Sequence, residues 1–316
     1  MSVRGMLQLS VMSFRLTDRD IEIIRYVERF RLLRSRAHIV RLFGGSKHLL
    51  RRLRKLYDNK YLYRLPDRTP YEQAVYGLGN EGADLLNAEF DLPRANVDHT
   101  QKNRTLGPRF IEHTLLVADI MIPVILACRA REDVRYISRE EILQQWAPEK
   151  TQKKRFKVGG RPFRWRVKFR HDNKTFQKSI EPDYMFGLEL PEDREEFFFL
   201  EADRQNMPVE SGNMNRSSIL KKQFQYWESW QKTSFHETNL YERHFGIPNI
   251  RTLFVLSTGY RGDKRLNRCL NANKRFQDGS GTGLFLFVNT ETLFAADDVL
   301  TAELTSGRGT GKTLIG

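Results

Sequence analysis

One stretch of the chain, residues 180–205, contains two strand-like apolar runs, and three of its carboxylates stand where the first run begins and the second run ends. The first run opens directly after Asp183, and the second ends on Glu201 and Asp203. Side chains two residues apart in a strand lie on the same face, so Glu201 and Asp203 are expected to lie side by side. If the two runs pair as a hairpin, Asp183 approaches from the neighbouring strand. The stretch therefore predicts a sheet whose edge carries an acidic cluster.

This cluster has two interpretations. Three neighbouring carboxylates repel one another unless a cation or a basic side chain lies between them. Oxygen-rich clusters suit Mg²⁺ or Mn²⁺, with Asp183 and Glu201 as the candidate ligands. That interpretation predicts a metal-dependent phosphodiester site. In the alternative, the acids only end the two strands and face solvent.

The chain as a whole is strongly basic. Its 316 residues include 53 Lys and Arg against 39 Asp and Glu, which gives a formal net charge of +14. Such a balance indicates a polyanionic partner, double-stranded DNA first and an anionic membrane surface second. The length is sufficient for two domains of ordinary size.

The apolar segments favour a cytoplasmic protein that does not associate with a membrane. Residues 114–128 form the most apolar segment, but it is too short to span a bilayer and contains Asp119 and Pro123. It is typical of a buried helix. The N-terminal residues lack the continuous apolar core of a secretory signal. Cys128 and Cys269 form no CxxC motif, which agrees with a reducing compartment.

Residues 14–92 predict a winged helix-turn-helix domain. A first helix begins after Thr17, and a second ends at Gly44-Gly45. A basic helix, SKHLLRRLRKLYD, then precedes the strand-like runs YLYRL and AVYGL. In proteins with this order of elements, the third helix lies in the DNA major groove.

The predicted DNA contacts follow from this arrangement. Leu49, Leu53 and Leu56 form a buried stripe on the third helix, so its cations face outward. The predicted contacts are Lys47, His48, Arg51, Arg52 and Lys55 on the helix and Arg64 and Arg68 in the wing. The alternative is a basic face that is only solvated. A winged helix also serves dimerisation, so a dimer remains open.

The second half of the chain predicts an α/β sheet covered by helices. After a polar linker at 93–107, a helix, strands with the acids, a helix and a strand follow in turn. Within it, RWRVKFR alternates strictly between basic and apolar residues. Its basic face, predicted to hold a nucleic-acid backbone, comprises Arg164, Arg166, Lys168 and Arg170. Its other face is predicted to be core.

Four segments together resemble a known family. They are LTDRDIEII with FRLLRSRAHIVRLF, the run RRLRKLYDNKYLYRL, the helix with Glu112-His113, and the block PD…FFFLEADRQ…LKKQFQYW. They are similar to the replication-relaxation family, which is encoded on plasmids and other mobile elements. The resemblance implies the winged helix at 14–92, a PD-(D/E)xK nuclease-like domain at 108–305, and a role near plasmid replication or mobilisation. Residues 306–316 are expected to form a flexible tail.

The resemblance also implies catalytic positions. Pro182-Asp183 matches the Pro-Asp element, and Glu201 matches the acid of (D/E)xK. Asp203 stands at the position of the catalytic lysine, which is the main departure from the pattern. In some relatives the lysine has moved to the following helix.

Three further residues complete the implied site. Lys221 or Lys222 on the following helix can take the place of the lysine, and Glu112 matches an acid on the first helix of some relatives. His113 can lean toward the acidic site like Glu112, although a lone histidine on a helix is more often a packing residue. If no lysine reaches the carboxylates, the domain binds DNA without cutting it.

Three functions therefore remain open. The first is a DNA-binding accessory protein of plasmid replication or mobilisation that works with a relaxase or replication proteins. The second is a Mg²⁺- or Mn²⁺-dependent endonuclease, and the third is a transcriptional regulator. Residues 306–313 look like a P-loop, but Ser306 stands where glycine is required, so no nucleotide cofactor is expected. No relaxase-type histidine motif is present in the sequence.

Overall fold

The computed structural model describes residues 14–66, 73–99, 105–171, 174–205, 207–212, 216–232, 237–257 and 262–316. The chain divides into two compact units, Met1–Phe90 with Val97–Thr105 and Asp91–Asn96 with Leu106–Gly316. The boundaries after Asn96 and Thr105 fall within the predicted polar linker at 93–107, and the boundary after Phe90 lies just before it. That interval is not wholly irregular, because α5 (Arg94–Val97) is a short helix.

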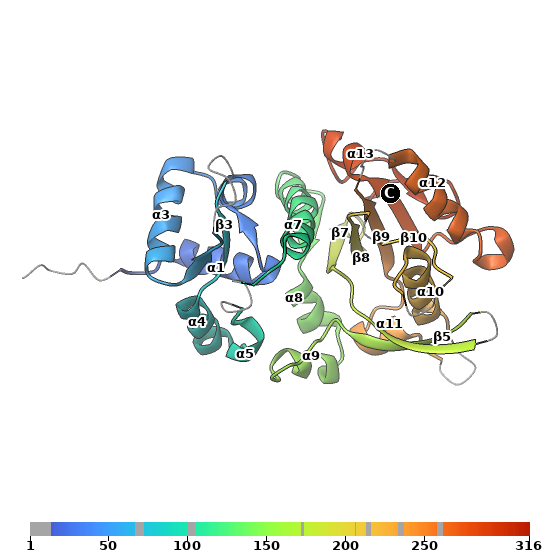
Figure 1. The fold of residues 1–316 in the computed structure, drawn as a ribbon, viewed down its shortest axis with the longest axis horizontal. Coiled ribbons are helices and arrows are strands. Elements are labelled where there is room, and N and C mark those ends of the chain that lie inside the picture. Colours follow the sequence, from blue (N-terminus) through green and yellow to red (C-terminus); the bar gives the residue numbers. More distant parts are fainter. Residues whose placement is uncertain are drawn as a thin grey trace, which may run out of the picture. The chain divides into compact units, whose positions relative to one another are not determined.

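The first unit has the predicted order of helices and strands (Figure 1). The elements are α1 (Asp18–Phe30), β1 (Leu33–Arg34), η1 (Ser35–Val40), α2 (Arg41–Phe43), α3 (Ser46–Asp58), β2 (Leu62–Arg64), β3 (Val75–Leu78) and α4 (Asn80–Phe90). The strands pair antiparallel in the order β1-β3-β2. The short strand β1 was not predicted.

Local sequence signals fix the ends of these helices. Thr17 and Asp20 form a capping box, in which the Thr17 backbone N–H donates to the Asp20 carboxylate over 2.7 Å. The backbone at Gly44 and Gly45 has φ of +68° and +70°, which ends α2 where the sequence predicts. The predicted leucine stripe of α3 is buried.

The second unit contains a seven-stranded mixed sheet, in the order β12-β11-β10-β9-β8-β7-β4. The strands are β4 (Arg135–Ile137), β7 (Tyr184–Leu190), β8 (Arg194–Asp203), β9 (Arg251–Leu256), β10 (Phe285–Asn289), β11 (Leu304–Ser306) and β12 (Gly311–Lys312). β8, β9 and β10 run parallel, and the other pairs are antiparallel. The predicted mixed α/β fold is confirmed.

Helices cover this sheet on both faces (Figure 1). They are α7 (Pro108–Arg129), α8 (Arg139–Glu141), η2 (Ile142–Trp146), α9 (Glu149–Arg155), α10 (Ile219–Trp230), α11 (Leu240–Phe245), α12 (Gly262–Asn273), η3 (Gln277–Gly279) and α13 (Thr290–Ala295). The core between the sheet and α10, α11 and α12 is rich in aromatic side chains, such as Phe199, Tyr226, Phe254 and Phe285.

The helix α7 contains the apolar segment that was predicted to be buried. Among the described residues it is the one helix that is long and apolar enough to cross a membrane, judged by length and composition alone. Half of its most apolar window is buried within the protein. It packs against β4 and β8, as expected of a core helix.

The predicted basic strand is part of a separate hairpin. β5 (Trp165–His171) and β6 (Lys174–Ile180) form a two-stranded antiparallel sheet. Trp165, Val167 and Phe169 are buried, as predicted, and the Trp165 indole N–H donates to Ser229 Oγ on α10 over 2.9 Å. On the opposite face of β5, Arg166 and Lys168 are exposed.

The last residues of the chain differ from the expectation of a flexible tail. β11 and β12 pair antiparallel at the edge of the large sheet, and Leu314 is buried. The Leu314 N–H donates to the Leu300 carbonyl over 3.1 Å. An apolar side chain near the end of the chain thus fixes this segment against the unit. The P-loop-like residues form a hairpin, not a loop that leads into a helix.

Candidate functional site

The acidic stretch lies at the carboxyl end of β8. The β7–β8 pairing ends at Tyr184 opposite Leu200, and the Asp183 N–H donates to the Leu200 carbonyl over 3.1 Å. This register places Asp183 opposite Glu201. Glu201 and Asp203 share the face of β8 that α10 and α12 cover, and both are buried.

Glu201 is held by two side chains of α10. Lys222 Nζ donates to Glu201 Oε2, and Tyr226 Oη donates to Glu201 Oε1 over 2.5 Å. Lys222 and Tyr226 lie four residues apart, so they occupy the same face of the helix. The Ser218 side chain caps the start of α10. Both carboxylate oxygens of Glu201 therefore have a donor from within the protein.

Asp183 is held from α7 and from its own hairpin. His113 Nε2 lies 3.1 Å from Asp183 Oδ1, and the Ala202 N–H donates to Asp183 Oδ2 over 2.9 Å. The hydrogen bond with Asp183 raises the pKa of His113, which favours the imidazolium form beside this carboxylate.

Asp203 has a basic partner of its own. Arg265 of α12 donates from Nε to Asp203 Oδ2 over 2.6 Å and from Nη2 to the Met207 carbonyl, also over 2.6 Å. Burial raises the pKa of Asp203, and the Arg265 charge opposes this effect. Asp203, at the position where the resemblance implies a catalytic lysine, is therefore part of an ion pair with α12.

The pKa values of Glu201, Lys222 and Asp183 depend on one another's charges. Burial raises the pKa of Glu201 to about 7, against the opposing effect of the Lys222 charge. Burial alone would lower the pKa of Lys222, but the charges of Glu201 and Asp183 outweigh it and raise that pKa. Burial also opposes ionisation of Asp183, yet Lys222 and His113 lower its pKa overall. The charge of Lys222 thus favours the ionised form of both carboxylates.

A divalent cation does not fit these residues as they are arranged. All four carboxylate oxygens of Asp183 and Glu201 already accept from His113, Ala202, Lys222 or Tyr226. Among the described residues, no group of three or more His, Cys, Asp or Glu side chains is arranged to hold a metal ion. The Lys222 ammonium supplies the positive charge that three neighbouring carboxylates require, so a basic side chain takes the place considered for a metal ion.

Only one of the two candidate lysines, and only one of the adjacent residues Glu112 and His113 on α7, contacts the acidic site. Lys221 Nζ donates to the Arg216 carbonyl, and only Lys222 contacts Glu201. Glu112 pairs with Arg204, while His113 is the α7 residue that contacts Asp183. Of the two alternatives for His113, the structure therefore favours contact with the acidic site over packing alone. Its position beside Glu112 was the available signal.

Tyr226 and Arg265 also escaped the sequence analysis. The four-residue spacing from Lys222 to Tyr226 is a local signal that places both on one helix face. No local signal points to Arg265, because it lies 62 residues from Asp203 in the chain.

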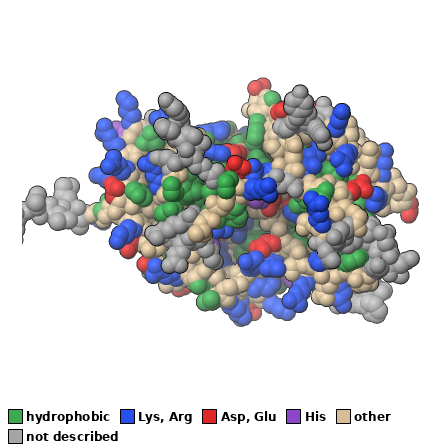
Figure 2. All heavy atoms as spheres, viewed as in Figure 1, with side chains coloured by type: hydrophobic (Ala, Val, Ile, Leu, Met, Phe, Trp, Pro, Cys, Tyr) green, Lys and Arg blue, Asp and Glu red, His purple; other side chains and the backbone are tan. Residues whose placement is uncertain are grey.

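Most of the predicted DNA contacts on α3 are exposed. Lys47, His48, Arg51 and Lys55 all lie at the surface. The space-filling view shows many Lys and Arg side chains at the surface (Figure 2). Opposite the leucine stripe, α3 therefore presents a cationic face.

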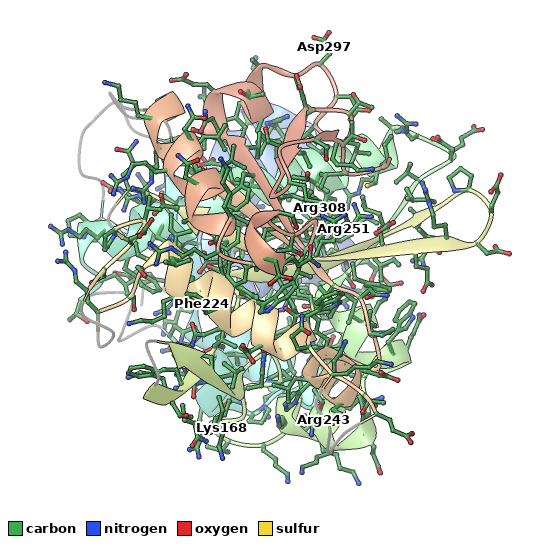
Figure 3. The ribbon with its side chains drawn as sticks, turned by 90° about the vertical axis from the view of Figure 1, so that its right-hand side faces the viewer. Lys168, Phe224, Arg243, Arg251, Asp297 and Arg308 are labelled. Carbon is green, nitrogen blue, oxygen red and sulfur yellow. The ribbon has the colours of Figure 1, made fainter. Side chains whose placement is uncertain are left out.

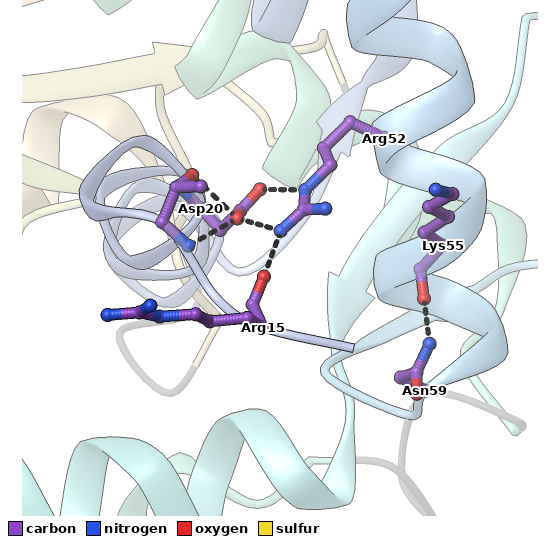
Figure 4. A network of polar contacts seen from close by, with 6 residues as sticks. Arg15, Asp20, Arg52, Lys55 and Asn59 are labelled. Atoms are coloured by element: carbon purple, nitrogen blue, oxygen red, sulfur yellow. Dashed lines mark hydrogen bonds and ion pairs between the residues drawn. The ribbon is translucent and has the colours of Figure 1, made fainter. Parts of the chain in front are cut away.

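Arg52 differs from its neighbours on α3. Its guanidinium donates to Asp20 Oδ1 over 2.8 Å and to the Arg15 carbonyl over 2.6 Å (Figure 4). It also lies 4.3 Å from the centre of the Phe14 ring. Asp20 is only 1% exposed. Arg52 therefore joins α1 to α3, and its contact with DNA stays a prediction.

The remaining predicted DNA contacts lie in the wing and on β5. Arg64, at the end of β2, is exposed, and Arg68 lies outside the described residues. Arg164, Arg166 and Lys168 are exposed, and Lys168 is labelled in Figure 3. The side chain of Arg170 also lies outside the described part of the chain.

Comparison with known proteins identifies the family. The sequence model of the replication-relaxation family matches residues 24–240, which is more than half of the chain and reaches into both units. No curated protein and no solved structure matches the chain. The chain therefore belongs to the replication-relaxation family, and this membership implies a role in plasmid replication.

Proposed function

We propose that the chain is a DNA-binding accessory protein of plasmid replication or mobilisation. The first unit binds duplex DNA with α3 in the major groove, in the manner of a winged helix. The observation that carries the proposal is the exposed cationic face of α3, with Lys47, Arg51 and Lys55, opposite a fully buried leucine stripe.

The second unit holds adjacent DNA through β5. Arg166 and Lys168 are exposed on the face of that strand opposite the buried Trp165 and Val167. Cations in such a row suit phosphates. The acidic site does not oppose this contact strongly, because His113, Lys222 and Arg265 offset its carboxylates. Relaxase or replication proteins at the same cytoplasmic DNA site are the proposed protein partners.

Fluorescence anisotropy with labelled duplex DNA tests the proposal. Alanine at Lys47, Arg51 and Lys55 removes three cations from α3, and binding is expected to weaken by tenfold or more, on the order expected for three lost phosphate contacts. A matched control carries alanine at Lys264, Arg268 and Lys274, three exposed cations of the α12 region. Equal weakening in both triple variants, or no binding by the wild type, would overturn the proposal.

A second candidate function is endonuclease activity. The observation that favours it is the Lys222 ammonium beside Glu201, since the resemblance to PD-(D/E)xK nucleases implies a lysine that reaches the acidic site from the following helix. There, the ammonium would offset charge that develops on a phosphate. A metal ion is not assigned to the site, because the carboxylate oxygens of Asp183 and Glu201 already accept hydrogen bonds from the protein.

A nicking assay on supercoiled plasmid tests the second candidate. The wild type is incubated with EDTA, Mg²⁺ or Mn²⁺ beside Asp183→Asn, Glu201→Gln and Lys222→Met. Lys221→Met is the matched control, since Lys221 donates to a backbone carbonyl. Nicking that the three site variants lose and the control keeps supports an endonuclease. Duplex binding without nicking under all conditions excludes one.

A further inference from the structure

The loop that follows α9 exposes two apolar side chains. Phe156 is 53% exposed and Val158 is 77% exposed, and both belong to the small group of large apolar side chains at the described surface. They lie two residues apart within residues 156–161, FKVGGR, which we call the FKV loop. Their exposure costs hydration free energy unless a partner covers them.

The FKV loop is held in one conformation by Asn96. The Asn96 side chain donates to the Lys157 carbonyl over 2.8 Å and accepts from the Gly159 N–H over 2.7 Å. Gly159 has a φ of +71°, and a Cβ at Gly160 would lie 1.8 Å from the Lys154 carbonyl oxygen. The two glycines therefore permit a tight turn that an ordinary side chain would open, and the exposed tip is preorganised.

The surroundings of the FKV loop are positive. No acidic residue occurs between Lys150 and His171, and the cations near the two apolar side chains in the sequence are Lys154, Arg155, Lys157, Arg161 and Arg164. Arg161 Nη1 lies 3.3 Å from Glu181 Oε2, and the Arg161 side chain stays 59% exposed. Burial lowers the pKa of the nearby His244 to about 4, and the charges of Lys154, Arg243 and Lys150 lower it further. A polyanion therefore suits this surface electrostatically.

We propose that the FKV loop is a wedge that inserts Val158 and Phe156 into the minor groove of duplex DNA. The inserted side chains partly unstack one base step and kink the duplex, while Lys157 and Arg161 contact the flanking phosphates. Apolar wedges beside cations are how proteins that bend DNA from the minor groove work. The inference rests on the proposed DNA binding and adds deformation of the DNA to it.

The dimensions of the loop favour DNA over a lipid surface. The minor groove is roughly 6 Å wide, so a tight two-residue tip suits it. Stable membrane binding by apolar side chains requires a larger apolar area, such as one face of an amphipathic helix. Only Phe156 and Val158 contribute large exposed apolar groups in this loop.

The test measures DNA bending with the full-length protein. A duplex carries a donor and an acceptor dye at its ends, and a second duplex carries 2-aminopurine at successive steps. The wild type is expected to raise energy transfer and to increase 2-aminopurine fluorescence at one step. The double variant Phe156→Ser, Val158→Ser is expected to lose both signals and to bind on the order of tenfold more weakly, as for loss of base stacking. Its salt dependence should be unchanged.

Two controls separate the wedge from general effects. Phe294 is 49% exposed on α13, so Phe294→Ser removes a comparable exposed ring elsewhere and should change neither signal. Lys157→Ala should keep the kink and reduce the salt slope by about one phosphate.

The outcomes are distinct for the two proposals. Bending that survives in the double variant overturns the wedge and leaves DNA binding in place, as does a wild type that binds duplex without bending it. A wild type that binds no duplex overturns both proposals. Binding to anionic phosphatidylserine vesicles that the double variant loses, without DNA bending, assigns the loop to a membrane and also overturns the wedge.

Discussion

Lys222 is the residue on which the acidic site depends most. Its ammonium lies beside Glu201 and is electrostatically coupled to Asp183. Lys222→Met leaves both carboxylates without this charge, and removal of one partner from a buried pair costs about 3–5 kcal/mol of unfolding free energy. We expect Lys222→Met to lose about 3 kcal/mol of unfolding free energy at pH 8. The loss should be smaller at pH 5, because Glu201 without Lys222 is protonated there and carries no unpaired charge. Urea denaturation measures the change.

Two further variants make the Lys222 result interpretable. Lys264→Met removes an exposed lysine and should be nearly neutral. The double variant Lys222→Met, Glu201→Gln should be more stable than Lys222→Met alone at pH 8, because it no longer buries an unpaired carboxylate. A double variant as unstable as the sum of the two single changes would contradict this account.

Glu201 makes the stability of the protein depend on pH. Burial raises its pKa from 4.5 to about 7, so between these values the folded state binds more protons than the unfolded state. The unfolding free energy is therefore expected to fall as the pH rises through this window, by up to about 3 kcal/mol from this group. His113, whose pKa is raised above 6.5, extends the decline to higher pH. Denaturation at pH 5, 6, 7 and 8 measures the slope.

The variant Glu201→Gln identifies the source of that slope. It keeps an acceptor for Tyr226 and removes the titrating group, so the decline between pH 5 and 7 should flatten. The lowered pKa of Asp183 acts elsewhere, since its contribution is present above pH 3.8 and is lost as the pH falls further. An unchanged slope between pH 5 and 7 in Glu201→Gln would assign the dependence to other groups.

At the scale of elements, α1 and α3 are joined by Arg52. The guanidinium donates through Nε and Nη2 to the buried Asp20 and also to the Arg15 carbonyl. Arg52→Lys keeps the charge but loses the planar fork, so we expect a loss of about 2 kcal/mol of unfolding free energy. Thermal unfolding followed by circular dichroism measures this loss.

The adjacent Arg51 provides the matched control for α3. Arg51 is exposed, so Arg51→Ala should leave the melting temperature within about 2 °C while it weakens DNA binding. The two arginines thus separate stability from binding on one helix. Stability that is equally reduced by Arg51→Ala and Arg52→Lys would remove the structural assignment of Arg52.

At the scale of the whole molecule, the net charge of +14 is expected to govern the proposed encounter with DNA. Each phosphate that is neutralised lowers the logarithm of the affinity by about 0.9 for a tenfold rise in salt. Alanine at Lys47, Arg51 and Lys55 should therefore make the slope shallower by about 3 if all three contact phosphates. Titrations at four salt concentrations between about 50 and 200 mM measure it. An affinity that does not change with salt would contradict an electrostatic contact.

The sequence by itself determined the features that depend on near neighbours in the chain. The helix start at Thr17, the stop at Gly44-Gly45 and the leucine stripe of α3 all followed from local spacing. The placement of Asp183 opposite Glu201 followed from strand alternation and a short hairpin. These signals act over a few residues, so no distant contact is needed to interpret them.

Only the tertiary structure decided which side chains meet. Neighbouring residues on a helix point about 100° apart, so the rotation of α10 against the sheet selects Lys222 over Lys221. In the same way, the packing of α7 selects His113 over Glu112, and Arg265 reaches Asp203 from a distant segment. Helix rotation is set by the whole buried interface. Residues far apart in the chain form that interface, and local spacing carries no information about it.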